Sequence, residues 1–175
     1  MNKTEDFIAY EKPIAIDSKL FRTDGYYVPV GSKYHALCFF ENGLMKSHVT
    51  WVDRDFWEDP DEKVKDFYRP QMLNTQESYG AYYVNGDTLT FQFFNRTNVE
   101  VYARSVNTTK GWIINDTTLK IFSEKAFLDS SDAPDELLEE PVLLRFYPST
   151  IKPDSTQAWF LTTSWYKKKA HPSRN

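Results

Sequence analysis

The sequence predicts an all-β protein whose strands form one antiparallel meander, closed into a barrel of about eight to ten strands. Between Tyr79 and Phe122, apolar and polar residues alternate with period two, which is typical of strands with one buried face. Turn-forming clusters interrupt this alternation at Asn85-Gly86, at 95–98, at 107–110 and at Asn115-Asp116. Asn-Gly between such runs is a strong hairpin signal, and sequential strands without intervening helices favour a meander barrel over a sandwich.

Further strands are expected on both sides of this central region. Ile14–Val30 contains a first strand, and His35–Val52 reads as a hairpin around a second Asn-Gly pair. A long acidic connection, Ser123–Pro141, follows the central meander. Two more strands are expected after it, over Val142–Tyr147 and Gln157–Trp165.

One short helix is predicted over residues 60–68, in the connection before the central meander. Asp59 suits the N-cap, and Pro60 suits the first helical position. Val64 and Phe67 lie at helical spacing, so one face of the helix can pack on the barrel. We expect this helix to cover one end of the barrel.

Turn arithmetic assigns residues of the meander to two faces. A two-residue turn at Asn85-Gly86 pairs Tyr82 with Leu89, and a two-residue turn at Asn115-Asp116 keeps Trp112 on the same face. The face expected inside the barrel consists of Tyr82, Val84, Leu89, Phe91, Phe93, Val99, Val101, Trp112, Leu119 and Ile121.

Composition limits the class of protein. The 175 residues suit one domain, with flexible tails expected at 1–12 and 167–175. Aromatic residues make up 17% of the chain and charged residues 26%, which indicates a soluble, aromatic-rich β protein. The net charge of −4 disfavours nucleic acid as a partner, because nucleic-acid binders usually carry a basic surface. No apolar run has the length of a membrane span.

Residues that would indicate catalysis or metal binding are few. His35, His48 and His171 lack the spacing of a zinc site, and Cys38 lies in an apolar run typical of a buried strand. The acidic residues of 53–62 lack the spacing and glycine of a calcium loop. A Gly-rich phosphate loop and a Gly-x-Ser-x-Gly motif are also absent from the sequence. We therefore expect no metal site and no cofactor, and a binding protein more readily than an enzyme.

Five motifs, spread over roughly residues 20–165, carry a family resemblance. They are Arg22–Tyr27, Phe39–Gly43, Gly80–Leu89, Gly111–Leu119 and Lys152–Thr156. Together they resemble the uncharacterised bacterial lipocalin-like barrel proteins. The resemblance implies a barrel with a cup-shaped interior and, in many relatives, an exported or lipid-anchored protein.

Localisation has two alternatives. Residues 1–6 lack the hydrophobic core of a signal peptide. Either the protein is cytosolic or an export signal lies outside this chain, and the resemblance favours a periplasmic or lipid-anchored protein.

Three functional classes remain. The first is a protein that binds a small apolar or amphipathic ligand in the barrel interior, which in an eight-stranded barrel is wide enough for one ligand or for side chains alone. The residues expected to contact the ligand are Tyr82, Phe91, Phe93, Trp112 and Trp159. The second is a packed barrel acting as an interaction or envelope-accessory protein, with a still unknown protein partner on its long connections. The third, a barrel enzyme, requires perturbed carboxylates or histidines that converge in the interior.

Overall fold

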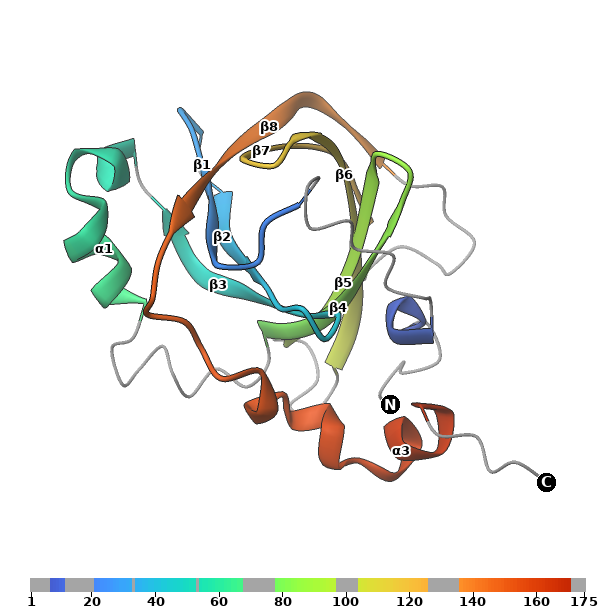
Figure 1. Ribbon diagram of the computed structural model, residues 1–175. Coiled ribbons are helices and arrows are strands. Elements are labelled where there is room, and N and C mark those ends of the chain that lie inside the picture. The colour runs from blue at the N-terminus through green and yellow to red at the C-terminus, as the bar shows by residue number, and fades with distance from the viewer. Residues whose placement is uncertain are drawn as a thin grey trace.

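The computed structural model is a closed antiparallel barrel in which each strand pairs with its sequence neighbours and β1 pairs with β8 (Figure 1). The structure describes residues 7–11, 21–32, 34–52, 54–67, 78–96, 104–125 and 136–170. The strands are β1 (Gly25–Pro29), β2 (Tyr34–Phe39), β3 (Leu44–Val52), β4 (Tyr79–Asn85), β5 (Thr88–Arg96), β6 (Arg104–Asn115), β7 (Thr118–Lys125) and β8 (Glu136–Pro148). The predicted all-β meander barrel is confirmed, with eight strands in the described residues.

Short helical segments surround the barrel. They are η1 (Ala9–Glu11), η2 (Arg54–Glu58), α1 (Pro60–Asp66), η4 (Ser155–Gln157), η5 (Trp159–Thr162) and α3 (Ser164–Ala170). The helix predicted over 60–68 is α1, with the Asp59 carboxylate accepting a hydrogen bond from the Glu62 N–H. Phe67 caps its C-terminus, and residue 68 lies outside the described residues.

The barrel wall separates two buried clusters. Alternate residues of β1 and β2 belong to different clusters, as period two requires. The outer cluster includes residues of the helical segments, which lie outside the barrel in Figure 1: Phe7, Ala9, Tyr26, Val28, Ala36, Cys38, Phe40, Leu44, Phe56, Val64, Phe67, Tyr79, Ala81, Phe94, Ala158 and Phe160. The inner cluster is Phe21, Tyr27, Tyr34, Leu37, Phe39, Met45, Tyr82, Leu89, Phe91, Ile113, Leu119, Ile121, Leu144 and Phe146. Burial on both faces explains the continuous apolar runs of β1 and β2, and Cys38 is buried as expected.

Helix α1 packs against the outer wall of the barrel. Phe67 stacks on His48 of β3 with ring centroids 4.6 Å apart, and contacts Tyr26 of β1 at 5.4 Å. The Tyr147 hydroxyl of β8 donates a hydrogen bond to the Asp61 carboxylate. The expectation that this helix covers an end of the barrel is therefore wrong, since its apolar face meets outward-facing residues of β1 and β3.

Residues 7–9 and the segment η5 pack on the same part of the wall, around β5. The Gln92 side-chain oxygen accepts hydrogen bonds from the N–H groups of Ile8 and Ala9, each at 2.8 Å, and Phe7 is fully buried. The ring of Phe7 contacts the rings of Phe94 and Phe160. Within the tails expected at 1–12 and 167–175, Phe7 and Ala9 are thus buried against the barrel, and residues 167–170 form the end of α3, where Lys167 and Lys168 are exposed.

Two strand predictions are also wrong. The residues expected to form a strand over Gln157–Trp165 form the end of η4, η5 and the start of α3 instead. The turn expected at 107–110 lies inside β6, which pairs continuously with β5 from Arg104 to Trp112. The described residues thus form eight strands, the lower end of the predicted range.

The β4–β5 hairpin keeps the predicted faces with a shifted register. Asn85 pairs with Thr88, so the turn residues are Gly86 and Asp87, and Tyr82 lies opposite Phe91 rather than Leu89. A shift of two residues leaves every side chain on its predicted face. Gly86 has φ of +62°, as expected, and it is the first central residue, which is the pattern of a type II′ turn.

Replacing Gly86 with Val should lower the free energy of unfolding by about 1–2 kcal/mol, because a side chain opposes the left-handed conformation. A Cβ atom on Gly86 has no neighbour within 4 Å in the described structure, so the effect comes from the backbone. Gly86→Asn is the control, since Asn tolerates positive φ and should lose less. Urea unfolding measures both, and equal stability of the two variants would contradict this assignment.

Replacing His48 with Phe should weaken the dependence of stability on pH. Burial, with help from Lys46 and His35, lowers the pKa of His48 to about 3. The unfolded imidazole has a pKa near 6.5, so between about pH 6.5 and pH 3 the unfolded chain binds the extra proton and the free energy of unfolding falls as pH drops. Phe can stack on Phe67 in the same place. Parallel unfolding curves for both proteins across this pH range would refute the prediction.

Candidate ligand site in the barrel

The two ends of the barrel differ in their connections. Three tight turns meet at one end, named here the turn end: 41–43, Gly86-Asp87 and Asp116-Thr117. The start of β1 and the end of β8 lie there too, because Gly25 pairs with Pro148. The connections 97–103 and 126–135 join strands at the opposite end, named the loop end.

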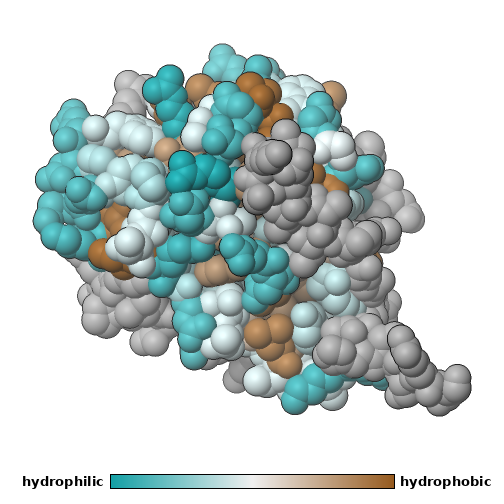
Figure 2. Space-filling view, viewed as in Figure 1, coloured by the Kyte–Doolittle hydropathy of each residue, from teal (hydrophilic) through white to brown (hydrophobic). Residues whose placement is uncertain are grey.

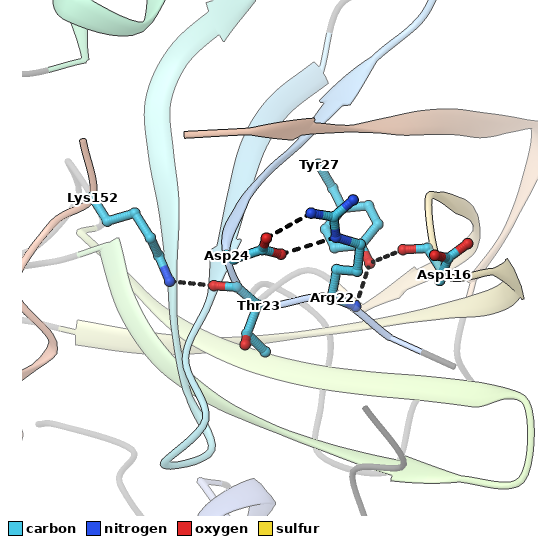
Figure 3. Close-up of polar contacts among 6 residues, drawn as sticks. All are labelled: Arg22, Thr23, Asp24, Tyr27, Asp116 and Lys152. Carbon is cyan, nitrogen blue, oxygen red and sulfur yellow. Dashed lines mark hydrogen bonds and ion pairs between the residues drawn. The ribbon is translucent and has the colours of Figure 1, made fainter. Parts of the chain in front are cut away.

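Phe21 closes the interior at the turn end. Its ring is buried, stacks on Tyr27 at 5.2 Å, makes an edge contact with Phe39 and a tilted contact with Tyr82. The Tyr27 hydroxyl accepts a hydrogen bond from the Arg22 N–H at 3.1 Å and donates one to the Asp116 carbonyl at 3.0 Å (Figure 3). Two hydrogen bonds between the Tyr27 hydroxyl and the backbone, one of them to the residue after Phe21, thus hold Phe21 across this end.

A polar network holds the same segment from outside (Figure 3). The Arg22 guanidinium donates two hydrogen bonds to the Asp24 carboxylate, at 2.9 and 2.6 Å, and this lowers the pKa of Asp24. The Lys152 ammonium donates to the carbonyls of Thr23 and Phe39. A groove of about 830 Å³ lies beside this network, lined by Thr23, Asp24, Phe40, Glu41, Asn42, Pro148, Ser149, Thr150, Lys152 and Ser155. The charged groups of this network already bind one another or the backbone. The network therefore fixes the position of the segment before β1 rather than offering free charges to a ligand in the groove.

Tyr82 and Phe91 fill the interior next to Phe21. Both are fully buried, and the Tyr82 hydroxyl donates a hydrogen bond to the Phe40 carbonyl at 2.7 Å. The Phe91 ring lies 5.8 Å from Phe39 and 6.2 Å from Phe93. The structure therefore places two predicted ligand residues inside the barrel, in its packed half.

Polar side chains meet inside the barrel near the loop end. Tyr34 of β2 reaches across the interior, and its hydroxyl donates a hydrogen bond to the Glu124 carboxylate of β7, a strand that is not its neighbour in the barrel. The Thr109 hydroxyl of β6 hydrogen-bonds the same phenol. Burial first, and then Glu124, raises the pKa of Tyr34 well above its ordinary value. The phenol therefore stays neutral and keeps its proton for Glu124.

Inward-facing apolar side chains next to this polar group remain partly accessible. Phe93, Leu138 and Val142 pack against the inner cluster without being fully buried. Asn107 lies directly opposite Phe93, and its side-chain oxygen is buried with no hydrogen-bond partner among the described residues. The loop half thus combines an apolar surface with an unsatisfied acceptor and a carboxylate.

Trp112 and Trp159 lie outside the barrel, so the prediction that they face its interior is wrong. Trp112 is 39% exposed and stacks on Phe122 at 4.2 Å. Bulges on both sides of it pair Trp112 with Lys120 and turn Ile113 inward instead. Trp159 belongs to η5 and contacts Phe94 on the outer wall at 4.9 Å.

The sequence prediction of the site missed Tyr34, Thr109 and Glu124. Each is a polar or amphipathic residue at the end of a strand or inside a suspected turn, where a solvent-facing position is the simpler interpretation. Only the cross-barrel approach of β2 to β7 brings Tyr34 and Glu124 together. Val99 and Val101, which were also expected inside, lie outside the described residues.

Comparison with protein-family models, with curated proteins and with solved structures finds no match for this chain. Within the described ranges, no helix is both long enough and apolar enough to span a membrane. Function is therefore inferred from the geometry of the barrel.

Replacing Phe21 with Ala should lower the free energy of unfolding by about 3–5 kcal/mol, because the ring leaves a cavity among three aromatic neighbours. Benzene should then raise the melting temperature of this variant and leave that of the wild type unchanged, since a dry apolar cavity binds such a ligand. Phe21→Leu is the matched control and should lose less. A benzene effect of equal size in the wild type would show that the turn half is not filled.

Proposed function

We propose that this protein binds a small apolar or amphipathic molecule in the loop half of its barrel. The observation that carries the proposal is a partly accessible apolar surface on the inner wall, at Phe93, Leu138 and Val142, with Asn107 directly opposite Phe93. The side-chain oxygen of Asn107 is buried and has no hydrogen-bond partner among the described residues. Sites for small molecules typically combine an apolar lining with a few converging polar groups. Membership of the lipocalin-like proteins, and export, are part of this proposal.

Both features favour an occupant with an apolar part and a hydrogen-bond donor. Each methylene group that the occupant buries contributes about 0.8 kcal/mol. A buried acceptor without a partner costs about 1–3 kcal/mol, which a donor on the ligand would offset. Of the five residues predicted from the sequence, Phe93 lines this site, while Tyr82 and Phe91 form the packed layer beneath it.

An interaction protein is the second candidate, and one observation favours it. The Trp112–Phe122 stack lies on the outer face of β6 and β7, close to Ile114, which is 55% exposed. On the face shown in Figure 2, however, hydrophobic residues of the described surface appear as separate small patches. Scattered apolar residues are normal on a monomer, so the interior site has the stronger support.

Replacing Phe93 with Ala should weaken binding of an environment-sensitive apolar dye roughly tenfold, equivalent to about 1.4 kcal/mol. Trp112→Ala is the matched control, because it removes a larger aromatic ring from the outside of the barrel and should leave the dye affinity unchanged. Fluorescence titration of the delipidated protein measures both affinities. Dye binding only above the melting temperature, or equal losses in the two variants, would overturn the proposal.

A further inference from the structure

We infer that the ligand carries a cationic head group, such as an alkylammonium, which binds the Glu124 carboxylate at the loop end. This inference rests on the proposed function and specifies the ligand for the same site. It depends on three features: the position of Glu124, the charges around it, and the apolar surface beside it.

Among the described residues, the Glu124 carboxylate has no cationic partner, and it faces the interior of the barrel. Its carboxylate accepts a hydrogen bond from Tyr34, whose ring belongs to the inner cluster, and the residue is only partly exposed. An ionised carboxylate offers about four acceptor positions, so one donor leaves room for a second. Partial burial makes an opposite charge a favourable partner for a carboxylate, which favours a cation at the second position.

The described side chains do not supply that cation. The described ion pairs, Arg22–Asp24 and Lys65–Glu62, lie elsewhere. His35 senses the charge of Glu124, but burial lowers the pKa of His35, so its ring is neutral near pH 7. Because none of the described side chains supplies the positive charge, we assign that charge to the ligand.

A second carboxylate increases the negative potential at this position. Glu136 of β8 is the direct cross-strand partner of Glu124, on the same face of the sheet. Like charges directly opposite each other on neighbouring strands are destabilising. A bound cation near both groups reduces this repulsion, whereas an anionic ligand increases it.

The surroundings fit an ammonium attached to an apolar chain. The partly accessible side chains of Phe93, Leu138 and Val142 supply the surface for the chain. The Tyr34 hydroxyl, itself bonded by Thr109, holds the carboxylate in place before the ligand arrives. Such preorganisation increases affinity because fewer groups must be ordered on binding.

The test compares three ligands that share one alkyl chain and differ in head-group charge. Octylamine, octanol and octanoate are titrated against the dye-loaded wild-type protein at pH 7. We expect octylamine to displace the dye at least tenfold more effectively than octanol, and octanoate to be the weakest. Because this ranking uses the wild type, it tests the inference even if a variant does not fold.

Glu124→Gln then identifies the residue responsible. The amide has the shape of the carboxylate without its charge, so the preference for octylamine should disappear while octanol binds as before. Glu139→Gln is the matched control: it removes one negative charge from an exposed position on β8 and should keep the preference. Loss of the preference in both variants would indicate a general charge effect and overturn the inference.

The remaining outcomes separate this inference from the proposed function. If the three ligands displace the dye equally, or octanoate is strongest, the interior binds small molecules and the cationic head group is wrong. If the dye itself does not bind in the folded protein, the proposed function fails, and the cationic ligand fails with it.

Discussion

The contact between Phe21 and the rings of Tyr27, Phe39 and Tyr82 is the constraint on which the rest of the barrel depends. A barrel of eight strands has an interior that side chains can fill, and these rings fill its turn half. Because Phe21 comes from outside the sheet, its position requires the hydrogen bonds of Tyr27 and the Arg22–Asp24 pair. Because the turn end is closed in this way, the proposed ligand site lies in the loop half.

The fold class followed from the sequence because its signals are local. Period-two alternation identifies strands wherever only one face is buried, and glycines at positive φ mark the turns after Asn42 and Asn85. Bulges are different, because they depend on how neighbouring strands pair, and those around Trp112 reversed its face. The segment Gln157–Trp165 was predicted as a strand because it contains a short run of closely spaced apolar residues. Buried helical turns have the same pattern.

The candidate site was predictable only in its apolar part. The inward position of Phe93 could be predicted from the alternation along β5. The observed register differs from the predicted one by two residues, which leaves Phe93 on the predicted face. Tyr34 and Glu124 are 90 residues apart in sequence and belong to strands that are not paired, so local patterns contain no sign of their contact. A charged residue in a strand is usually solvent-facing, and Glu124 departs from that expectation at the position where function is proposed.

The division of the interior also separates stability from binding. Strands β1 and β2 are buried on both faces, against the aromatic interior on one side and within the outer cluster, which includes residues of α1, on the other. Tyr34 projects from the start of β2, which pairs with β3 at this position. The Glu124 carboxylate is therefore held from across the barrel, by a residue of β2, and not by its own strand alone. The protein can therefore keep a charge and an acceptor without partners among the described residues at the loop end. The packed turn half contributes the free energy of folding that these polar groups do not.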